Sequence, residues 1–248
     1  GTNTDRINPA LNPIFGPEKS TSFEVGFKGS WDRVRLGLSV YKTDFDDFQA
    51  NSFTGTGFNL QNAGKIETDG WELDYSWQPF DNTNVSGYFA RSMGNYKSFL
   101  GGTCQDAFIF HTGNPDPGGN GNLEAEVCDR SGDKITGNPE NRAFISLTQT
   151  FPVSIGSLFL RAEYSHYSEK FTDGDMDPFT LSDDMSLLNV RMGIDIDSWD
   201  SRLTIWGRNI TDVREFHGSF DQPLGAGRMN SYPMEPRTYG ISITKNWN

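Results

Sequence analysis

Residues 188–196 read LNVRMGIDI, a run in which every second residue is apolar. The same alternation occurs at 34–40 (VRLGLSV), at 71–77 (WELDYSW) and at 239–247 (YGISITKNW). Because successive side chains of a strand point to opposite faces, each run predicts a strand with one apolar and one polar face. The apolar face packs on a second sheet in a soluble sandwich, whereas in an outer-membrane barrel it meets lipid.

Composition narrows the class of protein. The chain has 248 residues, 35% of them hydrophobic, and it lacks the run of ~20 apolar residues that a membrane helix needs. Alternating barrel strands are compatible with this composition. The net charge of -12 argues against a nucleic-acid partner. No Gly-x-Ser-x-Gly, phosphate-binding glycine loop or Cys-x-x-Cys motif occurs, so we expect no enzyme.

The lengths of the connections favour the barrel. Nine strands are predicted, at 21–29, 33–46, 61–78, 83–98, 141–152, 156–171, 186–197, 201–211 and 236–247. Short connections alternate with long ones, and the long ones fall at 47–60, 99–140, 172–185 and 212–235. Outer-membrane barrels have short periplasmic turns and long outer loops, and their strands are longer than those of most globular sheets. We therefore expect an all-β, antiparallel transmembrane β-barrel.

Three passages carry a resemblance to a known family. The passages are NPALNPIFGPEKSTSFEVGFKG (8–29), NAGKIETDGWELDYSWQP (62–79), and WGRNITD (206–212) with PRTYGISITKNW (236–247). They resemble passages that occur in the same order in TonB-dependent outer-membrane receptors. The resemblance implies a barrel of about 22 strands with a plugged lumen. The nine strands would be its C-terminal part, residues 1–20 the remnant of an extracellular loop, and residues 21–248 the barrel section. The plug domain and the TonB-binding segment are expected outside this sequence.

The resemblance also implies function and partners. We expect TonB-dependent active uptake of a scarce nutrient, such as a ferric siderophore, cobalamin or an oligosaccharide, across the bacterial outer membrane. The implied partners are outer-membrane lipid, the rest of the barrel with its plug, the TonB complex and the small-molecule nutrient. A passive porin or a structural barrel of an envelope assembly is the alternative, and a soluble β-sandwich binding module is the third class.

The candidate sites lie mainly in the predicted outer loops. Cys104 and Cys128 fall in a stretch rich in Gly, Pro and Asn, where we expect a disulfide. The acidic residues within 172–185 predict either a solvated acidic loop or a Ca²⁺ site. They are Asp173, Asp175 and Asp177, followed by Asp183 and Asp184. Aromatic and cationic residues suited to sugars or metal chelates form the candidate ligand set. They are Phe108, Phe110, His111, Phe216, Phe220, Arg228, Tyr232 and Arg237.

Charged residues of the predicted strands form a second group. They alternate with the apolar positions, so we expect them to face the lumen and to form salt bridges with the plug and with neighbouring strands. They are Arg33, Arg35, Glu72, Asp74, Arg161, Glu163, Arg191 and Asp195.

Overall fold

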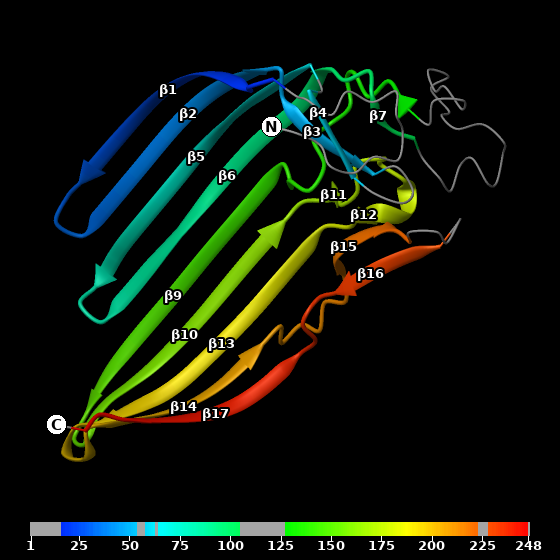
Figure 1. Cartoon of the computed structure of the whole chain (residues 1–248). Helices are drawn as coiled ribbons and strands as arrows, with labels where there is room; N and C mark the ends of the chain where they lie inside the picture. The colour runs from blue at the N-terminus through cyan, green and yellow to red at the C-terminus, as the bar shows by residue number, and fades with distance from the viewer. Residues whose placement is uncertain (1–15, 54–57, 63, 105–126, 223–227, 248) are drawn as a thin grey trace.

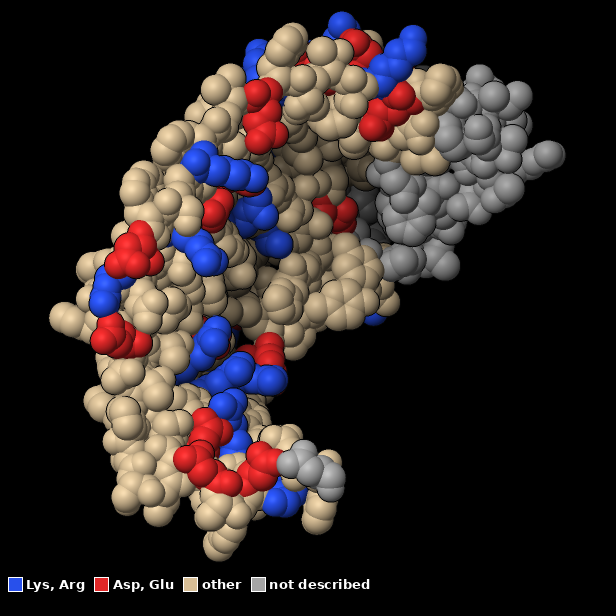
Figure 2. All heavy atoms as spheres, turned by 90° about the vertical axis from the view of Figure 1, so that its left-hand side faces the viewer, with Lys and Arg blue, Asp and Glu red and all other residues tan. Residues whose placement is uncertain are grey.

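The computed structural model of the chain describes residues 16–53, 58–62, 64–104, 127–222 and 228–247. One antiparallel sheet of nine strands dominates it, in the order β1-β2-β5-β6-β9-β10-β13-β14-β17, and the sheet curves into a trough (Figures 1 and 2). The strands are β1 (Lys19–Ser30), β2 (Val34–Asp46), β5 (Lys65–Phe80), β6 (Thr83–Ser98), β9 (Asn141–Val153), β10 (Gly156–Tyr167), β13 (Met185–Ile196), β14 (Ser201–Arg208) and β17 (Thr238–Lys245). Each strand therefore pairs with the wall strand that follows it in the chain.

The two ends of the sheet differ. Tight connections join β1 to β2, β5 to β6, β9 to β10 and β13 to β14 at one end, which we call the turn end (Figure 1). The last of these contains the 3-10 helix η2 (Asp197–Trp199). All the longer connections lie at the opposite end, the loop end (Figure 1). This placement is the one that the alternating lengths of the connections predict.

Small elements are built into the loop end. Four two-stranded sheets pair β3 (Gln49–Phe53) with β4 (Phe58–Asn62), β7 (Gly102–Thr103) with β8 (Val127–Cys128), β11 (Lys170–Phe171) with β12 (Leu181–Ser182), and β15 (Phe216–Asp221) with β16 (Met229–Pro233). The 3-10 helix η1 (Pro178–Thr180) lies between β11 and β12. Among the described residues no helix is long and apolar enough to cross a membrane.

The register separates an apolar face from a polar one. Val25 lies opposite Val40, which lies opposite Trp71, and their side chains share the convex face. Val25 and Val40 are 79% and 55% exposed to solvent, so no other described segment covers this face. A soluble sandwich would bury such a row against a second sheet. The exposed apolar face therefore excludes the sandwich and fits a wall that faces lipid.

The described core is small and lies at the loop end. Ala50 and Phe99 are buried together, with Phe48 and Tyr96 packed against them. The Tyr96 and Phe99 rings lie 4.9 Å apart between centroids. Because the wall itself is a single sheet, its stability depends on hydrogen bonding between strands and on burial in a bilayer rather than on a central core.

Several predicted boundaries were wrong at the loop end. The strand expected at 61–78 is divided, because Asn62 ends β4 and Gly64, with a φ of 94°, turns the chain into β5. The strand expected at 156–171 ends at Tyr167, and residues 170–171 form β11 instead. The first strand begins at Lys19, within the segment expected to be loop. Segments predicted as plain loops contain the small hairpins, because such short pairs carry no sustained alternation.

Candidate functional site at the loop end

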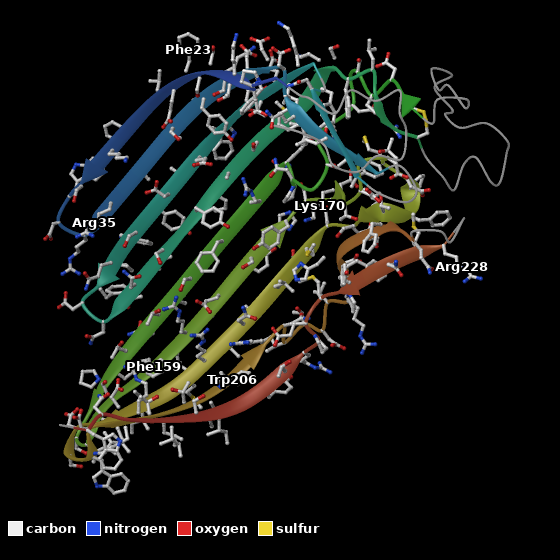
Figure 3. All side chains as sticks on the ribbon, in the orientation of Figure 1. Phe23, Arg35, Phe159, Lys170, Trp206 and Arg228 are labelled. Carbon is white, nitrogen blue, oxygen red and sulfur yellow. A yellow bond between two sulfur atoms is a disulfide. The ribbon has the colours of Figure 1, made fainter. Side chains whose placement is uncertain are left out.

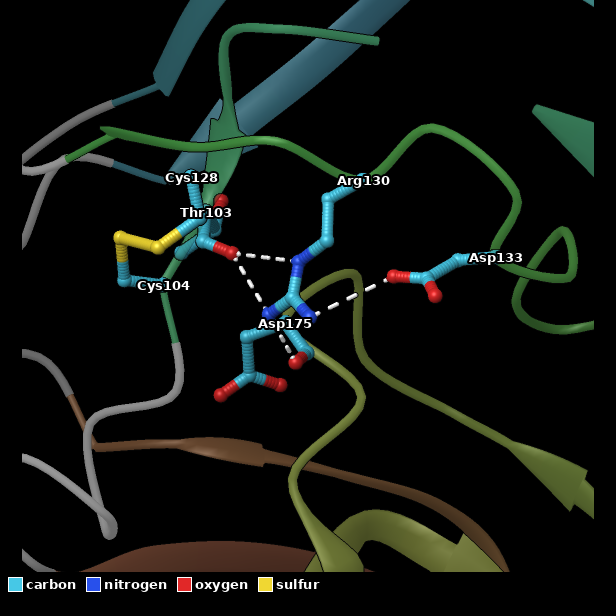
Figure 4. The surroundings of a disulfide bond; sticks show 6 residues. All are labelled: Thr103, Cys104, Cys128, Arg130, Asp133 and Asp175. Atoms are coloured by element: carbon cyan, nitrogen blue, oxygen red, sulfur yellow. Dashed lines mark hydrogen bonds and ion pairs between the residues drawn. A yellow bond between two sulfur atoms is a disulfide. The ribbon is translucent and has the colours of Figure 1, made fainter. Parts of the chain in front are cut away.

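A disulfide closes one connection at the loop end, and a buried arginine joins this connection to a second loop (Figure 4). Cys104 and Cys128 are bonded directly beside the β7–β8 pair. The Arg130 side chain is 7% exposed, and its Nε and Nη2 donate hydrogen bonds of 2.9 and 2.8 Å to the carbonyl oxygen of Thr103. Nη2 also donates to the carbonyl oxygen of Asp175, and Nη1 lies 3.4 Å from Oδ2 of Asp133. Arg130 thus joins the 99–140 connection to the acidic loop.

The acidic loop uses its carboxylates to shape the chain. Oδ1 of Asp173 accepts from the backbone N–H of Gly174 at 2.7 Å, and Oδ1 of Asp175 accepts from that of Asp177 at 3.1 Å. Asp177 caps η1 through the N–H of Phe179 at 2.8 Å. These are the local side-chain-to-backbone bonds that Asp forms in turns.

No metal-binding cluster accompanies these turns. The described part of the chain holds no group of three or more His, Cys, Asp or Glu residues placed to hold a metal ion. Asp175 and Asp177 are fully buried, and Oδ2 of Asp177 has no hydrogen-bond partner among the described residues. The Ca²⁺ site expected from Asp173, Asp175 and Asp177 therefore stays a prediction.

The β15–β16 hairpin is fastened to the β11–β12 segment. The buried Ser219 donates from its backbone N–H to Oγ1 of Thr172 at 2.8 Å, and the hydroxyl of Ser182 donates to the carbonyl oxygen of Phe216 at 3.1 Å. The hydroxyls of Ser219 and Ser231 bond across the hairpin at 2.8 Å. One face of the hairpin is thereby held down, and side chains at alternate positions point away from it.

Two candidate ligand residues, Phe220 and Tyr232, meet on that other face. The Phe220 and Tyr232 rings lie 5.7 Å apart between centroids, Tyr232 is 63% exposed, and Phe216 begins the same hairpin. Arg228 directly precedes β16 and is exposed at the tip (Figure 3). Arg237 lies apart from this group, with Nη2 4.0 Å from Oδ2 of Asp212. The other three candidates, Phe108, Phe110 and His111, lie outside the described residues.

Asp212 lies beside two arginines. Nη2 of Arg214 donates to its Oδ2 at 3.0 Å, and Arg237 lies on the same oxygen. The hydrogen bond from Arg214 is the main reason that the pKa of Asp212 is lowered from its usual value. The pKa of Asp129 is likewise lowered, by the hydroxyl and backbone N–H of Ser131. In both cases the hydrogen bonds favour the ionised form of the carboxylate.

A hollow that sequence reasoning missed opens between three segments of the loop end. Its lining residues are Ser92 and Gly94 of β6, then Lys134, Ile135, Thr136, Asn138 and Glu140, and finally residues 169–171 with Leu181. Lys134 lies on its wall with Nζ 2.6 Å from Oε1 of Glu140, and Lys170 reaches the carbonyl oxygen of Gly137 at 3.4 Å. No motif marks these residues, because the hollow exists only once the segments are folded together.

The concave face carries the charged residues of the strands, and Figure 2 shows Lys and Arg gathered in the hollow of the sheet. Nη2 of Arg161 lies 2.8 Å from Oε1 of Glu163, and Nη2 of Arg191 lies 3.7 Å from Oε2 of the same carboxylate. Arg202 bonds Asp195 through both oxygens, at 2.6 and 2.9 Å. The register confirms that Arg35, Glu72, Asp74, Arg161, Glu163, Arg191 and Asp195 alternate with the apolar convex residues. Arg33 lies in the connection before β2 and pairs with Asp81 at 2.7 Å.

Aromatic rings lie among these charges. The guanidinium of Arg202 stands 5.1 Å from the centre of the Phe159 ring, and that of Arg208 stands 5.1 Å from the Trp206 ring. Nε1 of Trp206 donates to the hydroxyl of Ser242 at 3.0 Å. Phe159 belongs to β10, and Trp206 belongs to β14, next to the edge strand β17 (Figure 3). The concave face is therefore polar and cationic, in contrast to the apolar convex face.

Comparison with solved structures shows the same fold in outer-membrane receptors. The chain aligns with the ferric yersiniabactin uptake receptor FyuA from Yersinia pestis with a TM-score of 0.69 and 18% identity, over 91% of this chain and 29% of that one. It aligns with the siderophore receptor PiuA from Acinetobacter baumannii with a TM-score of 0.68 and 17% identity, over 98% and 30%. The copper transporter OprC gives a TM-score of 0.64 and 15% identity, over 95% and 32%. The chain thus spans about a third or less of the receptors that it matches.

Sequence comparison identifies the family. A search of curated proteins found no significant match. The family model described as "TonB dependent receptor-like, beta-barrel" matches residues 1–210, which is most of the chain. The barrels of this family lie in the outer membrane of Gram-negative bacteria. With its nine-stranded wall, apolar convex face and polar concave face, the chain belongs to the TonB-dependent receptor-like β-barrel family.

Proposed function

We propose that the chain forms the C-terminal wall of a TonB-dependent receptor that takes up a small-molecule nutrient across the outer membrane. One observation carries the proposal: the family model matches this wall, which has an apolar convex face and has all its longer connections at one end. Such an end suits capture of a ligand from outside the cell. In this proposal a plug domain closes the lumen, and the TonB complex supplies the energy for its rearrangement.

We further propose that the ligand contacts the exposed face of the β15–β16 hairpin. Phe220 and Tyr232 offer two adjacent rings, and Arg228 adds a cation at the tip. Paired rings with a cation suit the flat, oxygen-rich surface of a metal chelate or a sugar. Siderophore receptors among the structural matches favour a ferric chelate, while the copper transporter shows that this fold carries other cargo.

Uptake by living cells tests the transport proposal. Cells expressing the full-length receptor are given a panel of radiolabelled ferric siderophores, cobalamin and oligosaccharides, with and without a functional tonB gene. We expect one class to accumulate only in the tonB-positive strain. Accumulation that is independent of TonB, together with open-channel conductance in planar bilayers, would instead support the passive porin.

Binding by the purified receptor tests the hairpin. The variant with Phe220→Ala and Tyr232→Ala is expected to bind the transported ligand about tenfold or more weakly, since truncation of an aromatic contact residue commonly costs more than 1 kcal/mol. The matched control is Phe23→Ala, because Phe23 is 74% exposed on the lipid-facing surface. Equal affinity in both variants would remove the hairpin from the binding site.

A further inference from the structure

The net charge of the chain is concentrated at the loop end. The longer connections are residues 47–64, 99–140, 168–184 and 209–237, and together they contain 18 Asp and Glu residues against six Lys and Arg residues. The difference, -12, equals the net charge of the whole chain, so the remaining residues are neutral as a group. Within the described residues of these connections the counts are 14 acidic and six basic residues. The loop end is therefore acidic, whereas the wall is balanced.

Most basic residues of these connections are already paired with carboxylates of the same connections. The pairs are Arg130 with Asp133, Lys134 with Glu140, and Arg214 and Arg237 with Asp212. The 168–184 connection contains one basic residue, Lys170, and its Nζ donates to the carbonyl oxygen of Gly137 at 3.4 Å. Four carboxylates of this connection have no Lys or Arg nitrogen within 4.0 Å among the described residues. They are Glu169, Asp177, Asp183 and Asp184.

One of these unpaired carboxylates is buried. Asp177 is fully buried, and its Oδ1 accepts from the N–H of Phe179, whereas its Oδ2 has no hydrogen-bond partner among the described residues. A buried carboxylate oxygen without a donor is costly, and a positive charge nearby lowers that cost. The segment that holds Asp177 packs on the candidate ligand hairpin, because η1 and β12 both contact β15. A cation held at the hairpin therefore lies close to carboxylates that lack one.

The hairpin itself presents a surface that suits a cation. The Phe220 and Tyr232 rings lie 5.7 Å apart between centroids, and Tyr232 is 63% exposed. The face of an aromatic ring attracts a cation, and paired rings are a common site for organic cations. A surface dominated by carboxylates raises the local concentration of cations and lowers that of anions. The rings and the acidic connections therefore select the same sign of charge.

We propose that the ligand captured at the β15–β16 hairpin carries a net positive charge. The inference rests on the proposed function, which places the ligand on this hairpin, and it narrows the ligand to an organic cation or a metal complex of net positive charge. An aromatic pair favours such a ligand over a small hydrated metal ion, which prefers oxygen ligands. Arg228, at the tip of the hairpin (Figure 3), has the same sign as such a ligand and so weakens the attraction.

Collisions of charged probes with a nitroxide measure the electrostatic potential at the hairpin. The full-length receptor, in a non-ionic detergent, carries the nitroxide on Tyr232→Cys; Cys104 and Cys128 are bonded to each other and do not take the label. Its relaxation by the tris(ethylenediamine)nickel(II) cation and by the tris(oxalato)chromate(III) anion is compared with that of the free label. We expect the cation to be favoured about threefold or more at low salt. At about 1 M salt the preference should disappear, since the Debye length is then about 3 Å.

Charge variants locate the source of the potential. The triple variant with Glu169→Gln, Asp183→Asn and Asp184→Asn is expected to lower the cation preference at low salt by about a third or more, because these carboxylates have no basic partner. Arg228→Gln is expected to raise the preference, because it removes a positive charge from the same hairpin. Since Arg228 is exposed at the tip, this variant decides the sign of the effect if the triple variant does not insert. An unchanged preference in both variants would overturn the proposal.

The matched control neutralises three carboxylates at the turn end, which lies at the opposite end of the sheet (Figure 1). It combines Asp32→Asn, Asp81→Asn and Asp200→Asn and is expected to leave the preference at the hairpin unchanged. An equal fall in this control would assign the preference to the net charge of the whole receptor, and the proposal would fail.

Three other results would also overturn it. A receptor that shows no preference for the cation at low salt has no attractive potential at the hairpin. If about 1 mM Ca²⁺ at constant ionic strength abolishes the preference, the carboxylates serve a metal ion rather than the ligand. A transported nutrient of net negative charge overturns the charge assignment while leaving the transport proposal intact. Because the collision experiment needs neither TonB nor a nutrient, a failure of uptake overturns transport alone and leaves this measurement readable.

Discussion

Replacing Arg130 by methionine is expected to loosen two loops that are far apart in the sequence. The substitution keeps an unbranched side chain of similar reach but removes every hydrogen bond of the guanidinium group. The carbonyl oxygens of Thr103 and Asp175 then lose their charged donor, and Asp133 loses its ion pair. Loss of such a donor costs about 1–3 kcal/mol for each buried acceptor. For the two carbonyls together we expect roughly 3 kcal/mol, a little more than a hundredfold in a local opening equilibrium.

Hydrogen exchange of the receptor in detergent measures this opening. Peptides covering 99–104 and 172–182 are expected to exchange about a hundredfold faster in Arg130→Met, while peptides from β13 keep their protection. Arg228→Met is the control, because the Arg228 residue is exposed at the hairpin tip. A change of less than about threefold in either peptide, or a change in only one of them, would refute the view that Arg130 joins the two loops.

Three further predictions concern single features. Intact mass measured with alkylation is expected to show Cys104 and Cys128 unmodified until reduction, and replacing both by serine is expected to destabilise the loop end by about 3 kcal/mol; alkylation without reductant would contradict the bond. Asp212, whose pKa is lowered by Arg214, contributes stability that is present above its unfolded pKa of about 3.9 and is lost as the pH falls through its folded pKa. The melting temperature of Asp212→Asn should therefore lie below that of the wild type at pH 6 and converge with it near pH 2; a constant difference would disprove the linkage. Gly87→Ala places a Cβ against the carbonyl oxygen of Phe144 on the next strand, and the free energy of unfolding obtained from urea titration is expected to fall by roughly 1–3 kcal/mol. Gly174→Ala, in open space, serves as its control.

The wall could be predicted from sequence because its signal is local and repeated. Lipid on one side and a polar lumen on the other impose a period of two on every wall strand, as at Leu158, Leu160 and Arg161. The aromatic candidates of 212–235 were identified by residue type, and the structure places Phe216, Phe220 and Tyr232 on one hairpin. Their grouping follows from a pairing that the sequence does not display.

Arg130 could not be identified from its surroundings in the sequence. Its partners Thr103 and Asp175 lie 27 and 45 residues away, so no local spacing marks the residue. The acidic loop shows the opposite problem, since its spacing is conspicuous and resembles a cation-binding loop. In the folded chain one oxygen of each of Asp173, Asp175 and Asp177 accepts from a backbone N–H. Aspartate is common in turns for this reason, so acidic spacing alone does not separate the two chemistries.

The open edges of the sheet show that the wall needs neighbours in order to be stable in a membrane. Each edge strand, β1 and β17, pairs with another strand of the described sheet on one side only. Unpaired backbone groups are very costly in hydrocarbon, so both edges require further strands when the convex face lies in lipid.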